Sequence, residues 1–541
     1  MLQTRFNFPA VYNPANQTKE ELIANFVVRL KEFHAIFDVI KKDGIKKTPP
    51  QHFIIQGMRG SGKTTLLLRL FYAVADDKKL EKFLVPVIFD EEQYNIRTLF
   101  KFWEEIALYL EEEHESLFHG LSDELQKYIE KVDYEEICFN LLLKRLQEAK
   151  RKLVLFIDNF GDMLTKFRRK ERQRLREVLI QCSDIRIVGG SSVVLEFHYD
   201  YSEPFFEFFK VISLEGLNQK ETEDLLLQLS ETYKTETVKK IVKRNPGRIE
   251  ALRRLTGGIP RTIILLFEIF LDHEKGDSFQ DLEIILDRVT PLYKHRMDGL
   301  SPQKQDIIDA IALNWDALGV KEIARKTRIP SKAVSAHLNE LEKNRIIEKI
   351  PTSTKNNLYQ VAERFFNIWY LMRHGRKRER KKVLWLVRFL ESWCNQITHN
   401  KKNIEYVKVD KIASSPPPYT TKHLTGTNSL KDIQELLKAN EIEKAIDMFG
   451  KFIESEETLN LDKELESILL LLLAKKQFHF TYKLFKENKF DIKDKFKPIY
   501  YALIYFMRDT YPDEYKKMGA ELLETVEEII KAVNQLAIDY K

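Results

Sequence analysis

The stretch Gln56–Thr65 reads QGMRGSGKTT, and it decides the fold of the N-terminal part of the chain. Gly57, Gly62, Lys63 and Thr64 fit the pattern G-x-x-x-x-G-K-[ST] of a phosphate-binding loop. The apolar run HFIIQG precedes this loop, and TTLLLRLFYAVAD, which has the composition of a helix, follows it. The loop therefore lies between a strand and a helix, which is the context that a nucleotide site of this type requires.

The loop carries the groups that hold a triphosphate. Glycines let its backbone N–H groups turn inward, and they are Gly57, Gly60 and Gly62. We expect Lys63 to reach the β- and γ-phosphates, Thr64 to ligate Mg²⁺, and Thr65 to hold the loop against the sheet. The sequence thus predicts a site for ATP or ADP together with Mg²⁺.

Further strands are predicted by the apolar runs FLVPVIFD, KLVLFIDNF, IRIVGGSS and FKVISLEGL. Helices are expected over residues 96–113 and 133–148 between them, and over residues 21–42 before the first strand. Strands of nearly continuous Val, Ile, Leu and Phe that alternate with helices indicate a parallel sheet covered on both faces. We therefore predict an α/β P-loop NTPase core over residues 1–217.

The strand LVLFI ends in Asp158, which we expect to order the metal ion directly or through water. A hydrolytic ATPase of the AAA+ type carries a glutamate at the next position, whereas this chain has Asn159, whose amide cannot accept a proton. Carboxylates that could orient the attacking water instead are Asp162, Glu91 and Glu92. Acidic residues after strands are often only helix caps, so this role stays open.

Two later stretches bear on the same site. GGSS ends the strand after Asp158, and there Ser191 or Ser192 would act as a polar sensor of the γ-phosphate, unless the stretch is only a turn. In LTGGIPRTI, Pro260 fixes the start of a helix and Arg261 would bring a guanidinium to the phosphates. The alternative is a helix break with a surface arginine.

The rest of the chain is predicted to be mainly helical. Residues 218–295 form an all-α lid, and residues 296–395 form a winged helix-turn-helix followed by a basic helix. Residues 396–429 are expected to be a linker, because residues 414–429 are rich in Pro, Ser, Thr and Gly. In residues 430–541 two stretches match at an offset near the tetratricopeptide (TPR) period of about 34 residues, although a plain helical bundle explains them equally well.

Composition excludes several classes. A chain of 541 residues suggests three or four domains. Its 3 cysteines form no C-x-x-C pair, so neither a disulfide framework nor a zinc site is indicated. No apolar run is long enough to cross a bilayer, and we expect a cytoplasmic protein without a membrane partner.

Charge is unevenly distributed. Residues 301–400 carry 19 Lys and Arg against 10 Asp and Glu, whereas the whole chain has a net charge of +6. Double-stranded DNA would meet Lys332 on the recognition helix, Lys355 at the wing tip, and Arg376 and Arg378 in the run RHGRKRERKK. A charge run of this kind is also common as a solvated helix end or as a partner of internal acidic groups.

The chain resembles the STAND and archaeal-type P-loop ATPases, which are AAA+-like and related in architecture to the origin-recognition initiator ATPases. The resemblance lies in four stretches that occur in this order and are followed by a winged helix: GMRGSGKTT, LFIDNF, GGSS and GGIPR. The resemblance implies that Lys63, Thr64 and Asp158 are phosphate and metal ligands and that Pro260 contacts the nucleotide. It also makes Arg261 similar to a sensor 2 arginine.

The resemblance covers residues 15–375 and implies a regulatory switch that hydrolyses ATP slowly to ADP and phosphate. In such a switch, ATP exchange would open the chain or promote a homo-oligomer, and the C-terminal helices would sense or recruit a protein. The alternative is an initiator-like or transposition-linked ATPase that grips DNA. A transcription regulator with a vestigial ATPase fits less well, because every residue of the phosphate loop is present.

Overall fold

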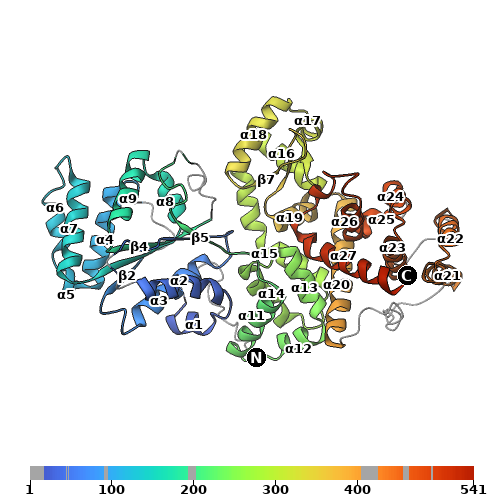
Figure 1. The fold of residues 1–541 in the computed structure, drawn as a ribbon, viewed down its shortest axis with the longest axis horizontal. Coiled ribbons are helices and arrows are strands. Elements are labelled where there is room, and N and C mark those ends of the chain that lie inside the picture. The colour runs from blue at the N-terminus through green and yellow to red at the C-terminus, as the bar shows by residue number, and fades with distance from the viewer. Residues whose placement is uncertain are drawn as a thin grey trace. The chain divides into compact units, whose positions relative to one another are not determined.

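The computed structural model describes residues 17–43, 46, 48–89, 95–192, 201, 203–403, 424–454, 462–488 and 491–540. The chain forms two compact units (Figure 1). Unit 1 comprises Met1–Lys234 and Ile259–Phe267, and unit 2 comprises Thr235–Gly258 and Glu268–Lys541. The segment predicted as one helical lid over residues 218–295 is therefore divided between the units.

Unit 1 contains a parallel five-stranded sheet of the P-loop type. Its strands, in spatial order, are β2 (Leu84–Phe89), β3 (Lys152–Ile157), β4 (Ile185–Ser191), β1 (Phe53–Gln56) and β5 (Lys210–Ser213). The predicted α/β core is confirmed. Strand β4 lies between the strand that enters the phosphate loop and the strand that ends before Asp158, so it brings its last residue between the two.

Helices cover both faces of the sheet, because alternate residues of each strand point to opposite sides. One core packs against α4 (Leu99–Glu113), α5 (Glu115–Phe118), α6 (Leu121–Gln126), α7 (Tyr134–Glu148), α8 (Phe160–Lys166) and α9 (Arg169–Gln181). The other packs against α2 (Leu30–Asp43) and α3 (Lys63–Asp76). Along β1, Ile54 belongs to the first core, and Phe53 and Ile55 belong to the second. Each such fully buried side chain contributes about 1.5–3 kcal/mol.

The N-terminal helix predicted over residues 21–42 is interrupted. Helix α1 (Lys19–Ala24) is capped by Asn25, and α2 begins only at Leu30. Arg29, just before α2, adopts a left-handed backbone conformation with φ of 66°. The prediction of a single helix was wrong because the apolar spacing continues across this break, so periodicity alone does not reveal it.

Unit 1 also includes α11 (Gln219–Thr232) and the first part of α14 (Pro260–Asp272). Unit 2 begins with α12 (Thr237–Arg244), α13 (Pro246–Thr256) and α15 (Ser278–Asp298). Next come α16 (Pro302–Asn314), β6 (Leu318–Gly319), α17 (Val320–Thr327), α18 (Ser331–Lys343), β7 (Ile347–Ile350) and β8 (Leu358–Val361). We call these elements, residues 302–361, the helix–hairpin module; β8 pairs antiparallel with both β6 and β7.

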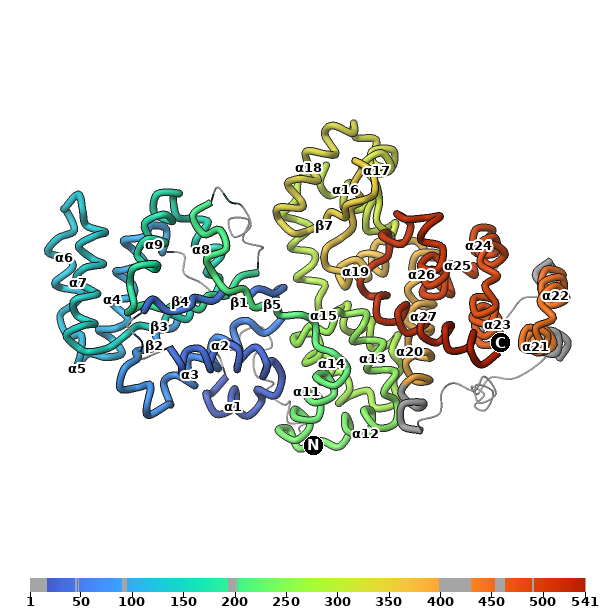
Figure 2. The backbone as a smooth tube through the Cα atoms, viewed as in Figure 1, coloured from blue at the N-terminus to red at the C-terminus, as the bar shows by residue number. Residues whose placement is uncertain are grey.

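The remaining elements of unit 2 are helical (Figure 2). They are α19 (Arg364–His374), α20 (Lys377–Asn403), α21 (Leu424–Lys438), α22 (Ile442–Glu454), α23 (Asp462–Ala474), α24 (Phe478–Glu487), α25 (Ile492–Lys495), α26 (Lys497–Phe506), the short 3₁₀ helices Tyr515–Lys517 and Ala520–Leu522, and α27 (Leu523–Asp539). Both ends of the segment predicted as a linker over residues 396–429 are thus helical, and residues 404–423 lie outside the described residues. No helix in the described ranges is both long enough and apolar enough to cross a membrane.

A buried ionic network joins α13 to α27 within unit 2. Arg254 donates from Nε to Glu250 at 2.8 Å, and from Nη1 and Nη2 to Glu528 at 2.9 Å. Arg253 donates to Glu250 at 2.7 Å and also pairs with Glu524. The buried charges of Glu250, Arg253 and Arg254 therefore each have a partner of opposite charge, as burial of a charge requires.

Candidate nucleotide site

The phosphate loop joins β1 to α3 and curls around the first turn of that helix. Gly60 and Gly62 have φ of 86° and 95°, a region in which only glycine is unstrained. The N–H of Gly57 donates to the carbonyl of Ser191 at 3.2 Å, which fastens the start of the loop to β4. The N-terminus of α3 therefore opens into the loop, where its first N–H groups and the helix dipole favour an anion.

Lys63 is held across this loop. Its Nζ donates to the carbonyl oxygens of Gly57 at 2.9 Å and of Met58 at 3.1 Å, and the side chain is largely buried. These contacts place the ammonium on the inner side of the loop. The predicted phosphate ligand thus lines the cavity described below.

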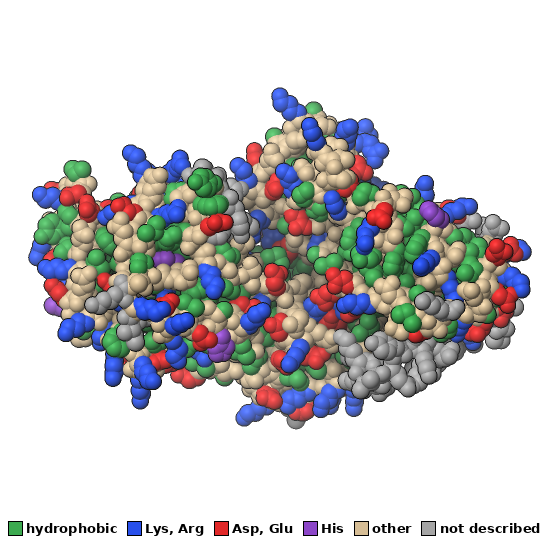
Figure 3. All heavy atoms as spheres, viewed as in Figure 1, with side chains coloured by type: hydrophobic (Ala, Val, Ile, Leu, Met, Phe, Trp, Pro, Cys, Tyr) green, Lys and Arg blue, Asp and Glu red, His purple; other side chains and the backbone are tan. Residues whose placement is uncertain are grey.

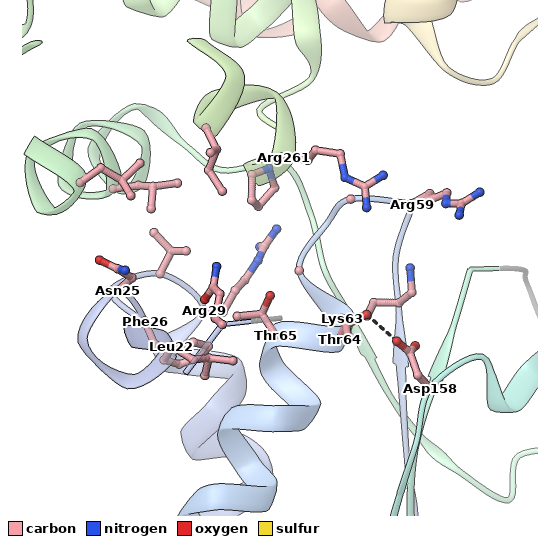
Figure 4. A pocket seen from close by; sticks show the side chains of 18 of the residues that line it. Leu22, Asn25, Phe26, Arg29, Arg59, Lys63, Thr64, Thr65, Asp158 and Arg261 are labelled. Atoms are coloured by element: carbon pink, nitrogen blue, oxygen red, sulfur yellow. Dashed lines mark hydrogen bonds between the residues drawn. The ribbon is translucent and has the colours of Figure 1, made fainter. Parts of the chain in front are cut away.

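Thr64 and Asp158 meet at the same point. The hydroxyl of Thr64 donates to Oδ2 of Asp158 (Figure 4). The N–H of Asn159 donates to Oδ1 of the same carboxylate at 2.9 Å. Asp158 is packed against β4, where a Cβ on Gly190 would lie 2.9 Å from Oδ1. A hydroxyl beside a carboxylate supplies the hard oxygen ligands that Mg²⁺ takes, so these residues fit that ion.

Asn159 occupies the position after Asp158 in a left-handed conformation, with φ of 51°, at the start of α8. Asparagine tolerates this conformation better than most residues. Among the described residues, Asp158 and Asp162 are the carboxylates that line the cavity. Glu91 and Glu92, the other predicted candidates, lie outside the described residues.

The end of β4 adds a hydroxyl to the cavity. Strand β4 continues through Gly189 and Gly190 to Ser191, so the alternative that GGSS is only a turn is wrong. Ser191 is fully buried, whereas Ser192 lines the cavity. Of the two predicted serines, Ser192 is therefore the one whose position lines the cavity.

The turn that carries Pro260 and Arg261 approaches the phosphate loop. The N–H of Arg261 donates to the carbonyl of Gly60 at 3.3 Å, and both Pro260 and Arg261 line the cavity. Figure 4 shows Arg261 at the same end of the cavity as Lys63. Arg59, which was not predicted as a site residue, lies at this end as well. This end of the cavity therefore gathers positive charge around the place for phosphates.

The other end of the cavity is mostly apolar and was not predicted. Its walls come from α1 and the break after it, from α11 and its C-cap, and from α14, and they include Leu22, Phe26, Val28, Leu225, Leu229, Tyr233, Ile264 and Phe267. Asn25 lies at this end, and its Oδ1 accepts a hydrogen bond from Thr232 at 2.8 Å (Figure 4). The whole cavity measures about 280 Å³ and would place an apolar, planar group at one end and charged groups at the other.

Arg29 fixes the break to the phosphate loop. It is 4% exposed, and its Nη2 donates to the carbonyl of Ser61 at 3.3 Å and to that of Glu215. Burial lowers the pKa of Arg29, while the nearby Glu32 carboxylate opposes this. The only local sign of this arrangement in the sequence is Asn25, a residue that often ends a helix.

The predicted nucleic-acid residues lie in unit 2 and are exposed, namely Lys332, Lys355, Arg376 and Arg378. Part of the basic run pairs internally, because Nη2 of Arg378 lies 3.6 Å from Asp494 and Nζ of Lys382 lies 3.3 Å from it. Lys332 also belongs to a second basic surface, whose other residues were not predicted. This surface consists of the exposed residues Lys321, Arg325, Lys326, Arg328 and Lys332 on α17, the following turn and the start of α18.

Comparison with known proteins gives only distant similarity. No protein-family model and no curated protein matches the chain. The Walker-type ATPase PABY2304 of Pyrococcus abyssi is a similar solved structure, with 15% identity, TM-score 0.42, and coverage of 63% of this chain and 95% of that one. Others are Aeropyrum pernix Orc1 in complex with DNA (13%, TM-score 0.35, 63% and 91%) and Pyrobaculum aerophilum Cdc6p (13%, TM-score 0.34, 71% and 98%). At this level the similarity carries no argument about function, which rests on the site.

Proposed function

We propose that this chain is a nucleotide-dependent switch that binds ATP and ADP with Mg²⁺ in unit 1 and hydrolyses ATP slowly, as the resemblance to STAND ATPases implies. The observation that carries the proposal is Asn159. It stands where a hydrolytic ATPase of the AAA+ type has its water-orienting glutamate, in a cavity that Lys63, Thr64 and Asp158 also line.

Each residue of the site has a definite task in this proposal. Lys63 and the loop N–H groups bind the β- and γ-phosphates, and Arg261 adds positive charge beside them. Thr64 and Asp158 would hold Mg²⁺, which when bound neutralises charge on the phosphate oxygens. Of the predicted carboxylates that the structure describes, we assign to Asp162, in the first turn of α8, the role of orienting water and accepting its proton.

Slow exchange of nucleotide follows from how the cavity is built. Residues of α1, α11 and α14 line its apolar end, and the Asn25 to Thr232 hydrogen bond ties the first two of these elements together. A base bound there would be enclosed on several sides, and its release would require these elements to part. We further propose that the C-terminal helix pairs of unit 2, which resemble TPR units in spacing, recruit a protein partner when the nucleotide state changes.

Steady-state hydrolysis tests the proposal. We expect slow, Mg²⁺-dependent turnover that Lys63→Ala abolishes together with nucleotide binding. Asp162→Asn should lower turnover at least tenfold while ADP still binds, and Asp123→Asn, at an exposed position of α6, is the control for loss of one carboxylate. If Asp162→Asn hydrolyses as fast as Asp123→Asn, the water-orienting role of Asp162 is wrong.

A second candidate function is a DNA-binding ATPase, and the basic surface of the helix–hairpin module favours it. Residues 320–335 carry 5 Lys and Arg against 1 Glu, a net charge of +4. Binding of duplex at low salt that weakens steeply as salt rises supports this function. No binding at low salt rules it out in favour of the switch alone.

A further inference from the structure

The loop between β7 and β8, residues 351–357, is held by a segment far along the chain. We call this loop the wing tip and residues 513–517 the clamp. Ser353 donates from its N–H to Oδ1 of Asp513 at 2.9 Å and from its hydroxyl to Oδ2 at 2.8 Å. Nζ of Lys516 donates to the carbonyl of Pro351 at 3.1 Å. Both ends of the clamp thus contact the helix–hairpin module, since Lys517 also accepts a backbone bond from Ala317 at 3.2 Å.

Hydrogen bonds within the wing tip involve residues other than Ser353. Thr352 accepts from the N–H of Thr354 at 3.1 Å, and Thr354 accepts from the N–H of Asn356 at 3.2 Å. The N–H and the hydroxyl of Ser353 instead converge on a single carboxylate. Backbone N–H groups and serine hydroxyls are the donors that commonly bind phosphate oxygens of nucleic acids, so Asp513 occupies a place that suits a phosphate.

Buried charged residues next to the clamp attach it to the helix–hairpin module. Glu521, a few residues beyond it, accepts from Nε of Arg364 at 2.8 Å and from Nε1 of Trp315 at 2.7 Å. Nζ of Lys497 lies 2.7 Å from Asp316 on the same side of the module. These pairs keep the clamp beside the wing tip. The two Ser353 bonds also lower the pKa of Asp513, which keeps its carboxylate charged.

The occupied wing tip belongs to the same module as the basic surface on α17 and α18. Figure 3 shows Lys and Arg side chains gathered where α17 and α18 form the end of unit 2. Lys355 of the wing tip is itself exposed. The module therefore offers many cations to an extended anion, while its Ser353 donors are already taken.

From this geometry we infer that the wing tip is a phosphate-binding element for double-stranded DNA, and that Asp513 occupies it as an internal anion until the clamp is released. The inference rests on the second candidate function and is independent of nucleotide turnover, so it can fail while the switch proposal stands. A duplex would exchange one backbone phosphate for the Asp513 carboxylate and would bind the basic surface at the same time.

Fluorescence anisotropy of a labelled short duplex, without nucleotide, tests this inference at about 50 and about 200 mM salt. Asp513→Asn weakens the internal anion, and we expect it to tighten binding about tenfold and to steepen the salt dependence by about one phosphate contact. Asp509→Asn is the matched control, because it makes the same charge change at an exposed position nearby. Adding Ser353→Ala to Asp513→Asn should abolish the increase in affinity for the duplex.

Lys516→Ala gives an independent readout, since it removes a cation but loosens the clamp, and we expect tighter binding despite the lost charge. Thermal unfolding of each variant verifies that it is folded, and should Asp513→Asn fail to fold, Lys516→Ala decides. Equal affinity of Asp513→Asn and Asp509→Asn overturns the inference. So does the absence of duplex binding by Asp513→Asn at low salt, or weaker binding by Lys516→Ala.

Discussion

Replacing Gly60 by alanine tests whether the turn at Arg261 closes on the phosphate loop. Gly60 has φ of 86°, and an alanine held in that conformation costs about 1–2 kcal/mol. Its Cβ would also lie 3.1 Å from Cβ of Arg261 and 3.2 Å from Cγ2 of Ile259. These neighbours can move only with the turn that lines the cavity. The contact would thus push the turn away and lengthen the 3.3 Å bond from the Arg261 N–H to Gly60.

We expect Gly60→Ala to lower ADP affinity about tenfold, the equivalent of about 1.4 kcal/mol, in a titration with a fluorescent ADP analogue. Gly120→Ala is the matched control, because Gly120 also has a positive φ, 72°, but a Cβ there meets nothing within 4 Å. Both variants should unfold at a lower temperature, and only Gly60→Ala should lose affinity. Wild-type ADP affinity in Gly60→Ala, with the same stability loss as Gly120→Ala, would refute the reasoning.

Three other predictions concern hydrolysis, folding and pH. Asn159→Glu should raise the rate of single-turnover hydrolysis by at least about tenfold, since a positioned general base typically contributes 10²–10⁴-fold. An unchanged rate would show that the attacking water does not lie beside residue 159. Arg254→Met leaves the Glu528 carboxylate without its main cation and should cost about 3–5 kcal/mol in urea unfolding of unit 2, whereas a loss below about 1 kcal/mol would show that the network is not coupled. Burial lowers the pKa of His52 to about 4, and its Nδ1 accepts from the Ile187 N–H at 3.1 Å. The unfolded chain therefore takes up a proton first, so stability should fall by up to about 3 kcal/mol as pH drops from about 6.5 to about 4, and His52→Gln should lack this loss.

The sequence predicted the sheet and the phosphate end of the site because their signals are local. QGMRGSGKTT and LVLFID each carry their pattern within one strand and the turn after it. Their meeting, seen in the Thr64 to Asp158 hydrogen bond, follows from the order of parallel strands.

The apolar end of the cavity depends instead on contacts between distant segments. Residues around Asn25 line it only because α11 and α14 pack opposite them, and nothing near Asn25 in the sequence encodes that partner. Similarly, Gly189 and Gly190 are part of a strand and not of a turn, and their lack of side chains leaves room for Phe160 and Asp158 to pack on that strand. A Cβ on Gly189 would lie 2.6 Å from Phe160. The pairing of Arg378 with Asp494 could likewise not be predicted from local sequence patterns, because the two residues are far apart in the chain.

The nucleotide carried by freshly purified protein, with its exchange rate, tests the central claim most directly. Nucleotide can be released by denaturation and identified by chromatography, and its exchange followed with the fluorescent ADP analogue. We predict nearly stoichiometric bound ADP that exchanges much more slowly than a typical ATPase turns over, which is about 1–10³ per second. Protein that purifies free of nucleotide and turns over ATP within that range would contradict the account.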